Sequence, residues 1–329
     1  MTKQAVLLLA HGTPETVEQI PEYLRNVVSG RPVPQAVVEE IQHRYSLIGK
    51  SPLTEITNAQ ARLVEAELAG AGERIPVYVG MRNWRPYIAD VVKQMRTDGV
   101  EEAAVICMAP QNSRTSVGLY RRAVEAEAGS LRIDFTAGWA DHPLLADAFA
   151  ERLRPALAKL SAEVGETVPV LFTAHSVPTR TVEAAAAGAE NAGPKLWPGL
   201  AAVGDSYAQD ARRTAELVAA RVPEIPRWWF AFQSQGASGG PWIGPSVEET
   251  LDRIAAEGVK ALILQPIGFL CDHVEILFDV DIHFREYALN KSIRLERPQS
   301  LNESETLARA VADLAEQGLR RLKDASVSR

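Results

Sequence analysis

Short apolar runs alternate along the chain with longer segments in which apolar residues recur every three or four positions. The helical spacing is clearest at 58–72 and 245–260. Strands that alternate with helices predict parallel sheets covered by helices on both faces. The apolar runs have the length of buried strands and lie at 5–10, 75–80, 103–109, 132–136, 168–174, 227–233, 260–266 and 292–295.

The order of these elements repeats. "AHGTP" at 10–14 and "AHSVP" at 174–178 each follow an apolar run, and each is followed by a strand, a helix and another strand. The repeat predicts an α/β protein of two similar doubly wound domains, 1–145 and 146–302, and a last helix over 303–325 that can pack on the first. The Ala-, Gly- and Pro-rich segment 181–199 is expected to form a helix and an irregular lip.

Composition narrows the class of protein. The formal net charge of -7 gives no general attraction to nucleic acid or to anionic lipid. No apolar stretch approaches the roughly 20 residues of a membrane-spanning helix, and the N-terminus lacks a signal-peptide pattern, so we expect a cytoplasmic protein. Cys107 and Cys271 are the only cysteines. They are too few for a disulfide scaffold or for the four thiolates of an iron-sulfur cluster, and no such cluster is expected.

Two histidines stand where open α/β sheets keep their chemistry. His11 and His175 each follow a predicted buried strand, at the edge where the carboxyl ends of parallel strands meet. A single histidine at a strand end is more often structural than catalytic. Two imidazoles and an acid at one crevice would instead indicate metal ligation or proton transfer.

The acid is expected in "CDHVEILFDVDIH" at 271–283. If a helix starts at Asp272, then Glu275, Asp279 and His283 lie on one face, and these ligand types suit a divalent metal such as iron(II). His273 would tune Glu275 as a partner that does not itself bind the metal. The alternative is that Asp272 and Glu275 only cap the helix.

A cationic segment, 27–53, contains Arg31, Arg44 and Lys50 between proline and glycine breaks. It is either a solvated face or a lip whose guanidinium groups hold ligand carboxylates. The dinucleotide-binding, P-loop, nucleophile-elbow and C-x-x-C motifs do not occur in the sequence.

Together these residues resemble the ferrochelatase family, whose members insert iron(II) into a porphyrin. The resemblance extends over nearly the whole chain and rests on "GTPETVEQIPEYL", "RYSLIGKSPLTEIT", "GMRNWRPYI", "APQNSRTSVGLYRRAV", "TAHSVP", "FQSQGASGGPWIGPS", "GFLCDHVEILFDVDI" and "SLNESE". It implies two similar Rossmann-like domains, each with a four-stranded parallel sheet flanked by helices, and a porphyrin cleft. It also implies iron(II) as substrate, with no prosthetic group.

The resemblance assigns roles to individual residues. His175 and Glu275 match the catalytic pair, and His11, Asp279 and His283 join them as candidates for handling the metal. The candidates for porphyrin contacts are His11, Arg31, Arg44, Ser51 and Tyr120.

Two positions depart from the branch of the family that uses coproporphyrin III. That branch usually has tyrosine at position 11 and often histidine at position 83, where this chain has His11 and Asn83. The segment "SGRPVP…RYSLIGKSPL" nevertheless favours coproporphyrin III over protoporphyrin IX. The alternatives are a cobalt or nickel chelatase acting on a sirohydrochlorin-type ring and a non-catalytic porphyrin or haem carrier. A monomer is expected.

Overall fold

The computed structural model describes residues 2–70, 75–113, 116–179, 206–235 and 241–327. The chain forms two compact units. Unit 1 comprises Met1–Pro110, Ser116–Trp139 and Asn302–Arg329, and unit 2 comprises Gln111–Thr115 and Ala140–Leu301. The segment 181–199, for which a helix and a lip were expected, lies outside the described residues.

Unit 1 contains a parallel four-stranded sheet in the order β2-β1-β3-β4. Its strands are β1 (Gln4–Ala10), β2 (Val77–Met81), β3 (Glu102–Cys107) and β4 (Arg132–Thr136). The central strand β1 is fully buried from Ala5 to Leu9, because the sheet is covered on both faces.

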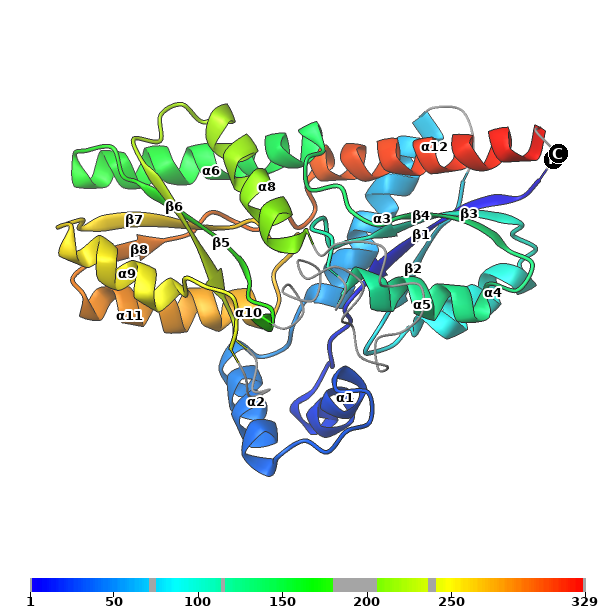
Figure 1. The fold of residues 1–329 in the computed structure, drawn as a ribbon, viewed down its shortest axis with the longest axis horizontal. Coiled ribbons are helices and arrows are strands. Elements are labelled where there is room, and N and C mark those ends of the chain that lie inside the picture. Colours follow the sequence, from blue (N-terminus) through cyan, green and yellow to red (C-terminus); the bar gives the residue numbers. More distant parts are fainter. Residues whose placement is uncertain (1, 71–74, 114–115, 180–205, 236–240, 328–329) are drawn as a thin grey trace, which may run out of the picture. The chain divides into compact units, whose positions relative to one another are not determined.

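Helices cover both faces of the unit 1 sheet (Figure 1). On one face, α4 (Ile88–Thr97) and α5 (Val117–Ala128) bury Val92, Met95 and Val124 against Leu7 and Val105. On the other face, α3 (Leu53–Gly70) packs on β2, and α12 (Glu305–Val327) packs on α3, β3 and β4. The remaining helices, η1 (Val17–Gln19), α1 (Ile20–Val27) and α2 (Gln35–Ile48), lie between β1 and α3 in the chain.

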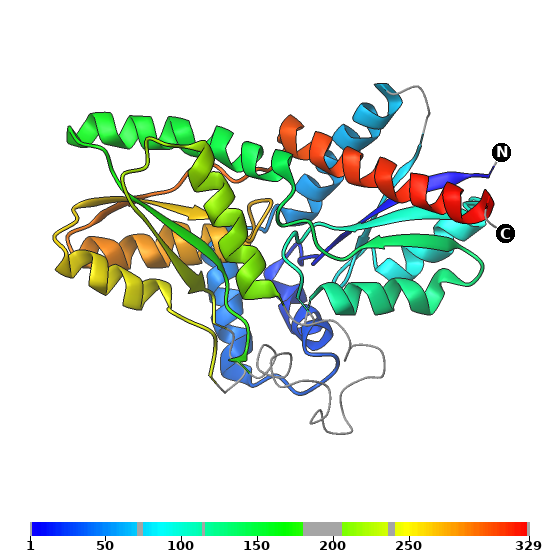
Figure 2. The ribbon, with the colours of Figure 1, turned by 45° about the horizontal axis from the view of Figure 1, so that its top comes forward.

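Unit 2 repeats the same topology, with a parallel sheet in the order β6-β5-β7-β8. The strands are β5 (Val170–His175), β6 (Trp228–Gln233), β7 (Ala261–Pro266) and β8 (Arg294–Glu296). One face packs on α9 (Val247–Ala256), α10 (Val274–Leu277), the π-helix η3 (Asp279–Phe284) and α11 (Arg285–Asn290). The long α6 (Pro143–Val164) packs on β7 and on α8 (Tyr207–Arg221), as Figure 2 shows.

The structure thus confirms the fold class and all eight predicted strands, each within a few residues of its expected position. The expected division at 145/146 falls inside α6, which begins at Pro143 and packs within unit 2. Ser246 is the N-cap of α9: its hydroxyl accepts from Glu249 N, and the Glu249 carboxylate accepts from Ser246 N. No described helix is long and apolar enough to cross a membrane.

The topology places His11 and His175 at equivalent positions. In each unit the chain leaves the central strand for one neighbour and then returns to the other side, which creates a switch point at the carboxyl end of β1 or β5. A glycine allows close packing at each point. Gly12 has φ +77° and a Cβ there would meet Met81, while a Cβ on Gly268 would lie 3.0 Å from Ala174.

Candidate active site

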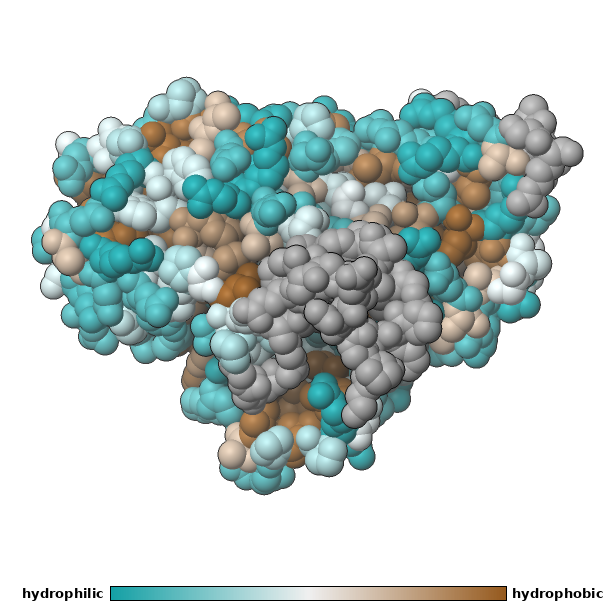
Figure 3. Space-filling model, viewed as in Figure 1, coloured by the Kyte–Doolittle hydropathy of each residue, from teal (hydrophilic) through white to brown (hydrophobic). Residues whose placement is uncertain are grey.

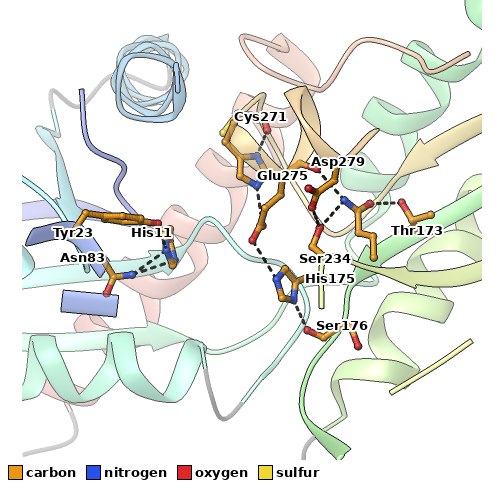
Figure 4. A network of polar contacts seen from close by, with 12 residues as sticks. His11, Tyr23, Asn83, Thr173, His175, Ser176, Ser234, Cys271, Glu275 and Asp279 are labelled. Carbon is orange, nitrogen blue, oxygen red and sulfur yellow. Dashed lines mark hydrogen bonds and ion pairs between the residues drawn. The ribbon is translucent and has the colours of Figure 1, made fainter. Parts of the chain in front are cut away.

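A carboxylate lies between two imidazoles at the carboxyl end of β5 (Figure 4). Glu275 Oε1 is 3.2 Å from Nε2 of His175, and Oε2 of the same carboxylate is 3.2 Å from Nε2 of His273. His175 is the last residue of β5, His273 is the N-cap of α10, and Glu275 lies in the first turn of that helix. The short helix therefore brings both acid and second imidazole to the strand end, as predicted for His175, Glu275 and His273.

The second nitrogen of each ring faces a main-chain carbonyl. Nδ1 of His175 contacts the oxygen of Ser176, and Nδ1 of His273 lies 3.0 Å from the oxygen of Cys271. Since a carbonyl can only accept, both Nδ1 atoms carry hydrogen. In a neutral ring, Nε2 is then an acceptor, as the Glu275 carboxylate is. A hydrogen bond between either Nε2 and the carboxylate therefore needs one further proton. The three side chains can hold two such protons, and their net charge changes from -1 without them to +1 with both.

Electrostatics favours the charged forms of His175 and Glu275. Burial lowers the pKa of His175, but the charge and hydrogen bond of Glu275 outweigh it, helped by the Ser176 carbonyl and Asp279, and the pKa is raised above its usual value. Burial likewise raises the pKa of Glu275, but His175 and His273 lower it well below the usual range. Each partner therefore favours the charged form of the other, and the pair lies partly open, with about a third of each side chain exposed.

Aromatic rings line the imidazoles. The rings of Phe269 and Trp242 lie 6.3 and 6.4 Å from that of His175, and Phe269 lies 4.5 Å from the ring of His273. These apolar neighbours limit access of water to the polar group and suit a ligand with a flat apolar face.

The expected stripe of ligands on one helix face requires correction. The helix begins at Val274, not at Asp272, whose carboxylate instead accepts from Ser300 and pairs with Arg297 at 3.1 Å. The helix then widens into the π-helix η3, in which His283 N donates to the oxygen of Phe278, five residues earlier.

This change of helical geometry separates the environments of the three predicted ligands. His283 is half exposed and contacts Glu248 of α9 at 3.2 Å, whereas Asp279 is buried and accepts from Ser234. Within the described part of the chain, no group of three or more His, Cys, Asp or Glu side chains could hold a metal ion. Roles of these residues toward iron stay predictions.

In unit 1, His11 lies in a separate polar group (Figure 4). Its Nε2 is 2.9 Å from the hydroxyl of Tyr23 on α1, and the amide nitrogen of Asn83 lies 3.2 and 3.1 Å from Nδ1 and Nε2. The amide of Asn26 donates to the Asn83 carbonyl and so fixes the loop after β2. A phenol and an amide thus orient the imidazole of His11.

The predicted porphyrin contacts have different environments. Arg31 is exposed and donates to the oxygen of Val28, while Arg44 on α2 pairs with Glu40 at 2.9 Å. Figure 3 shows apolar surface around α1 and α2, at the bottom of that view. This surface and the two arginines have the character expected for an apolar ring that carries carboxylates.

The other two candidates are buried in unit 1. The Ser51 side chain lies two residues before α3 begins at Leu53, and its hydroxyl has no hydrogen-bond partner among the described residues. Tyr120 lies in the α4–α5 core with the guanidinium of Arg82 5.8 Å from its ring centre, and burial raises the pKa of its phenol. Cys107 and Cys271 are each buried in their own unit.

Sequence reasoning missed the residues that support these groups. Tyr23 lies beside His11 only through tertiary packing, and no local motif identifies it. Gln233 and Ser234 could have been found, because "FQS" ends the strand that follows "TAHS", and sequential parallel strands are commonly neighbours.

Comparisons with known proteins find relatives over nearly the whole chain. A family model described as ferrochelatase matches residues 3–319. A ferrochelatase of Acidobacterium capsulatum is 58% identical over 98% of this chain and 96% of its own length. A coproporphyrin III ferrochelatase of Mycolicibacterium vanbaalenii is 34% identical over 96% of this chain and 90% of its own length.

Among solved structures, the sirohydrochlorin chelatase SirB from Bacillus subtilis subspecies spizizenii, in complex with cobalt, matches with a TM-score of 0.54. The match covers 96% of this chain and 95% of SirB at 10% identity. At this identity the likeness shows a shared chelatase-like fold.

Proposed function

Because the chain belongs to the ferrochelatase family, we propose that it inserts iron(II) into coproporphyrin III in haem biosynthesis. Membership makes the protein a lyase that inserts metal into a porphyrin. The choice of coproporphyrin III over protoporphyrin IX is the finer part of the proposal.

One observation carries the mechanism: Glu275 bridges His175 and His273. A porphyrin must lose two pyrrole N–H protons when a divalent metal enters the ring. Starting from the form in which neither N···O contact holds a proton, the three side chains can accept two, one in each contact. Proton number and charge therefore match the reaction, and the group can pass the protons to water through its exposed part.

The surroundings of the group support binding of a macrocycle. Phe269 and Trp242 supply apolar contact beside His175, where the pyrrole nitrogens must come close to the base. In unit 1, His11 is proposed as a further contact for the porphyrin.

Several features favour coproporphyrin III. Its four carboxylates need more cationic or hydrogen-bonding partners than the two of protoporphyrin IX, and Arg31 and Arg44 offer planar guanidinium groups suited to carboxylates. A relative named coproporphyrin III ferrochelatase aligns over 96% of this chain. Ligand carboxylates would compete with Glu40 for Arg44.

The test is anaerobic insertion of iron(II) into coproporphyrin III and protoporphyrin IX, measured side by side by absorbance. The proposal predicts a kcat/KM for coproporphyrin III at least about tenfold higher, which corresponds to about 1.4 kcal/mol. Equal or higher efficiency with protoporphyrin IX would overturn the choice of porphyrin. Tight binding of both without insertion would indicate a carrier, and cobalt insertion into sirohydrochlorin alone would indicate the other chelatase class.

Three further expectations stay predictions. These are activity without a prosthetic group or iron-sulfur cluster, a monomeric state and a cytoplasmic location.

A further inference from the structure

We propose that Gln233 is a positioning residue that holds Glu275 in contact with His175. The inference rests on the proposed function and adds a residue outside the group formed by Glu275 and its two imidazoles. Gln233 is the last residue of β6, and its main chain and side chain bind the two sides of the His175–Glu275 pair.

The main chain of Gln233 fixes the His175 side. His175 and Gln233 are register partners in the β5–β6 ladder. The Gln233 carbonyl accepts from the nitrogen of Ser176 at 2.7 Å, and the Ser176 carbonyl in turn contacts Nδ1 of His175. The position of the imidazole therefore depends on the end of β6.

The side chain of Gln233 fixes the Glu275 side. Its Nε2 donates to the main-chain oxygen of Glu275 at 3.1 Å, and its Oε1 accepts from the hydroxyl of Thr173 at 2.6 Å. In the opposite orientation the amide oxygen would face the main-chain oxygen of Glu275, and both atoms are acceptors. The two partners therefore determine the orientation of the amide. The amide thus links α10 to the strand that ends in His175.

Burial makes these contacts matter. Thr173 is 0% and Gln233 1% exposed, and water cannot replace a partner that either loses. The Gln233 amide also lies 3.3 Å from the hydroxyl of Ser234, which donates to Asp279 at the start of η3. The network therefore holds both α10 and the π-helix against the end of β6.

A purely structural role would predict a different kinetic result. If Gln233 acts through Glu275, its loss moves the carboxylate without removing any porphyrin contact, so kcat falls while KM is kept. A misplacement of about 1 Å can cost on the order of 100-fold in rate. General destabilisation would instead reduce the amount of active protein and leave the kcat of the folded fraction unchanged.

The experiment compares Gln233→Met with Gln265→Met under single-turnover iron insertion. Gln265 is a matched control: it is equally buried, lies on the neighbouring strand β7 and donates to the Pro266 carbonyl. We expect Q233M to lose 10- to 100-fold in the insertion rate, with porphyrin affinity within about twofold, and Q265M to stay within about threefold of the parent. Thr173→Val should show a partial loss that Thr173→Ser restores.

A double substitution separates positioning from other effects. In the Glu275→Ala background, Q233M should cause no further loss, because the group it positions is gone. An undiminished rate in Q233M, or an equal fractional loss with and without Glu275, would overturn the proposal.

A measurement that does not depend on turnover separates failure of the positioning role from failure of the proposed function. In crystal structures, His175 Nε2 and Glu275 Oε1 should move beyond hydrogen-bond distance in Q233M and stay within it in Q265M. If the parent inserts no iron, the proposed function fails, and the positioning role is still decided by this distance. An unchanged distance in Q233M would refute it.

Discussion

Nε2 of His175 and Oε1 of Glu275 lie 3.2 Å apart, although one residue ends strand β5 and the other lies in the short helix α10. The second carboxylate oxygen contacts His273 at the same distance. The proposed base and a second proton acceptor thus lie side by side, which is the arrangement that the proposed removal of two pyrrole protons requires.

Replacement of Glu275 by glutamine should lower the pKa of His175. The carboxylate is what raises that pKa against the opposing effect of burial, so without its charge the pKa should fall to or below about 6.5. In the parent, His175 stays protonated to a higher pH than this. Because a protonated imidazole cannot accept a pyrrole proton, insertion should decline as the pH falls through the raised pKa of His175. Imidazole NMR titration of the parent and of E275Q measures the change. A His175 pKa that stays raised in E275Q would contradict the assignment.

His283→Ala should keep iron insertion within about twofold of the parent. The structure directs this imidazole to Glu248 on α9, half exposed to solvent, rather than to the carboxylate of Glu275. Steady-state kinetics at limiting iron(II) checks this. A large rise in the KM for iron would instead indicate that His283 binds the metal, as the sequence predicts.

The sequence predicts Glu275, Asp279 and His283 on one helix face, and the structure separates them. This difference shows how far the sequence could predict the site. The eight strands were found because each is a short apolar run with breaks on both sides, and the pairing of His175 with Glu275 followed from strand ends and from the family resemblance. The side-chain direction of His283 could not be predicted, because it depends on whether the helix is an α-helix or a π-helix. A π-helix depends on tertiary contacts such as Ser234 with Asp279, which a regular helical period does not reveal.

Gln233 and Tyr23 were missed for a related reason. The role of Gln233 depends on β6 lying beside β5, and that of Tyr23 on α1 packing near the end of β1. The first neighbourhood could have been expected, because sequential parallel strands are commonly neighbours, whereas no local motif indicates the second.

Arg297→Met should destabilise the protein by about 3 kcal/mol. The guanidinium binds both oxygens of Asp281, at 2.6 and 2.7 Å, and pairs with Asp272, and its side chain is only 12% exposed. Its loss removes the cation that the carboxylates of Asp272 and Asp281 share beside α10 and η3. Urea unfolding measures the effect. Arg321→Met is the matched control, because the exposed Arg321–Asp134 pair should contribute at most about 1 kcal/mol. Equal losses in the two variants would contradict the prediction.

Arg31→Ala and Arg44→Ala should each raise the KM for coproporphyrin III several-fold and change kcat little. Each removes a guanidinium proposed to bind a carboxylate far from the reacting nitrogens, which affects ground-state and transition-state binding alike. Arg62→Ala, an exposed arginine on α3, is the control. If all three variants behave alike, the cationic segment is only a solvated face.

The most direct test of the central claim is the single-turnover rate of anaerobic iron(II) insertion into coproporphyrin III by the parent, His175→Ala and Glu275→Ala. The account predicts insertion by the parent and a loss of 100- to 10,000-fold in each variant, on the order of what a general base contributes, with porphyrin still bound. Insertion at near-parental rates by either folded variant would contradict it.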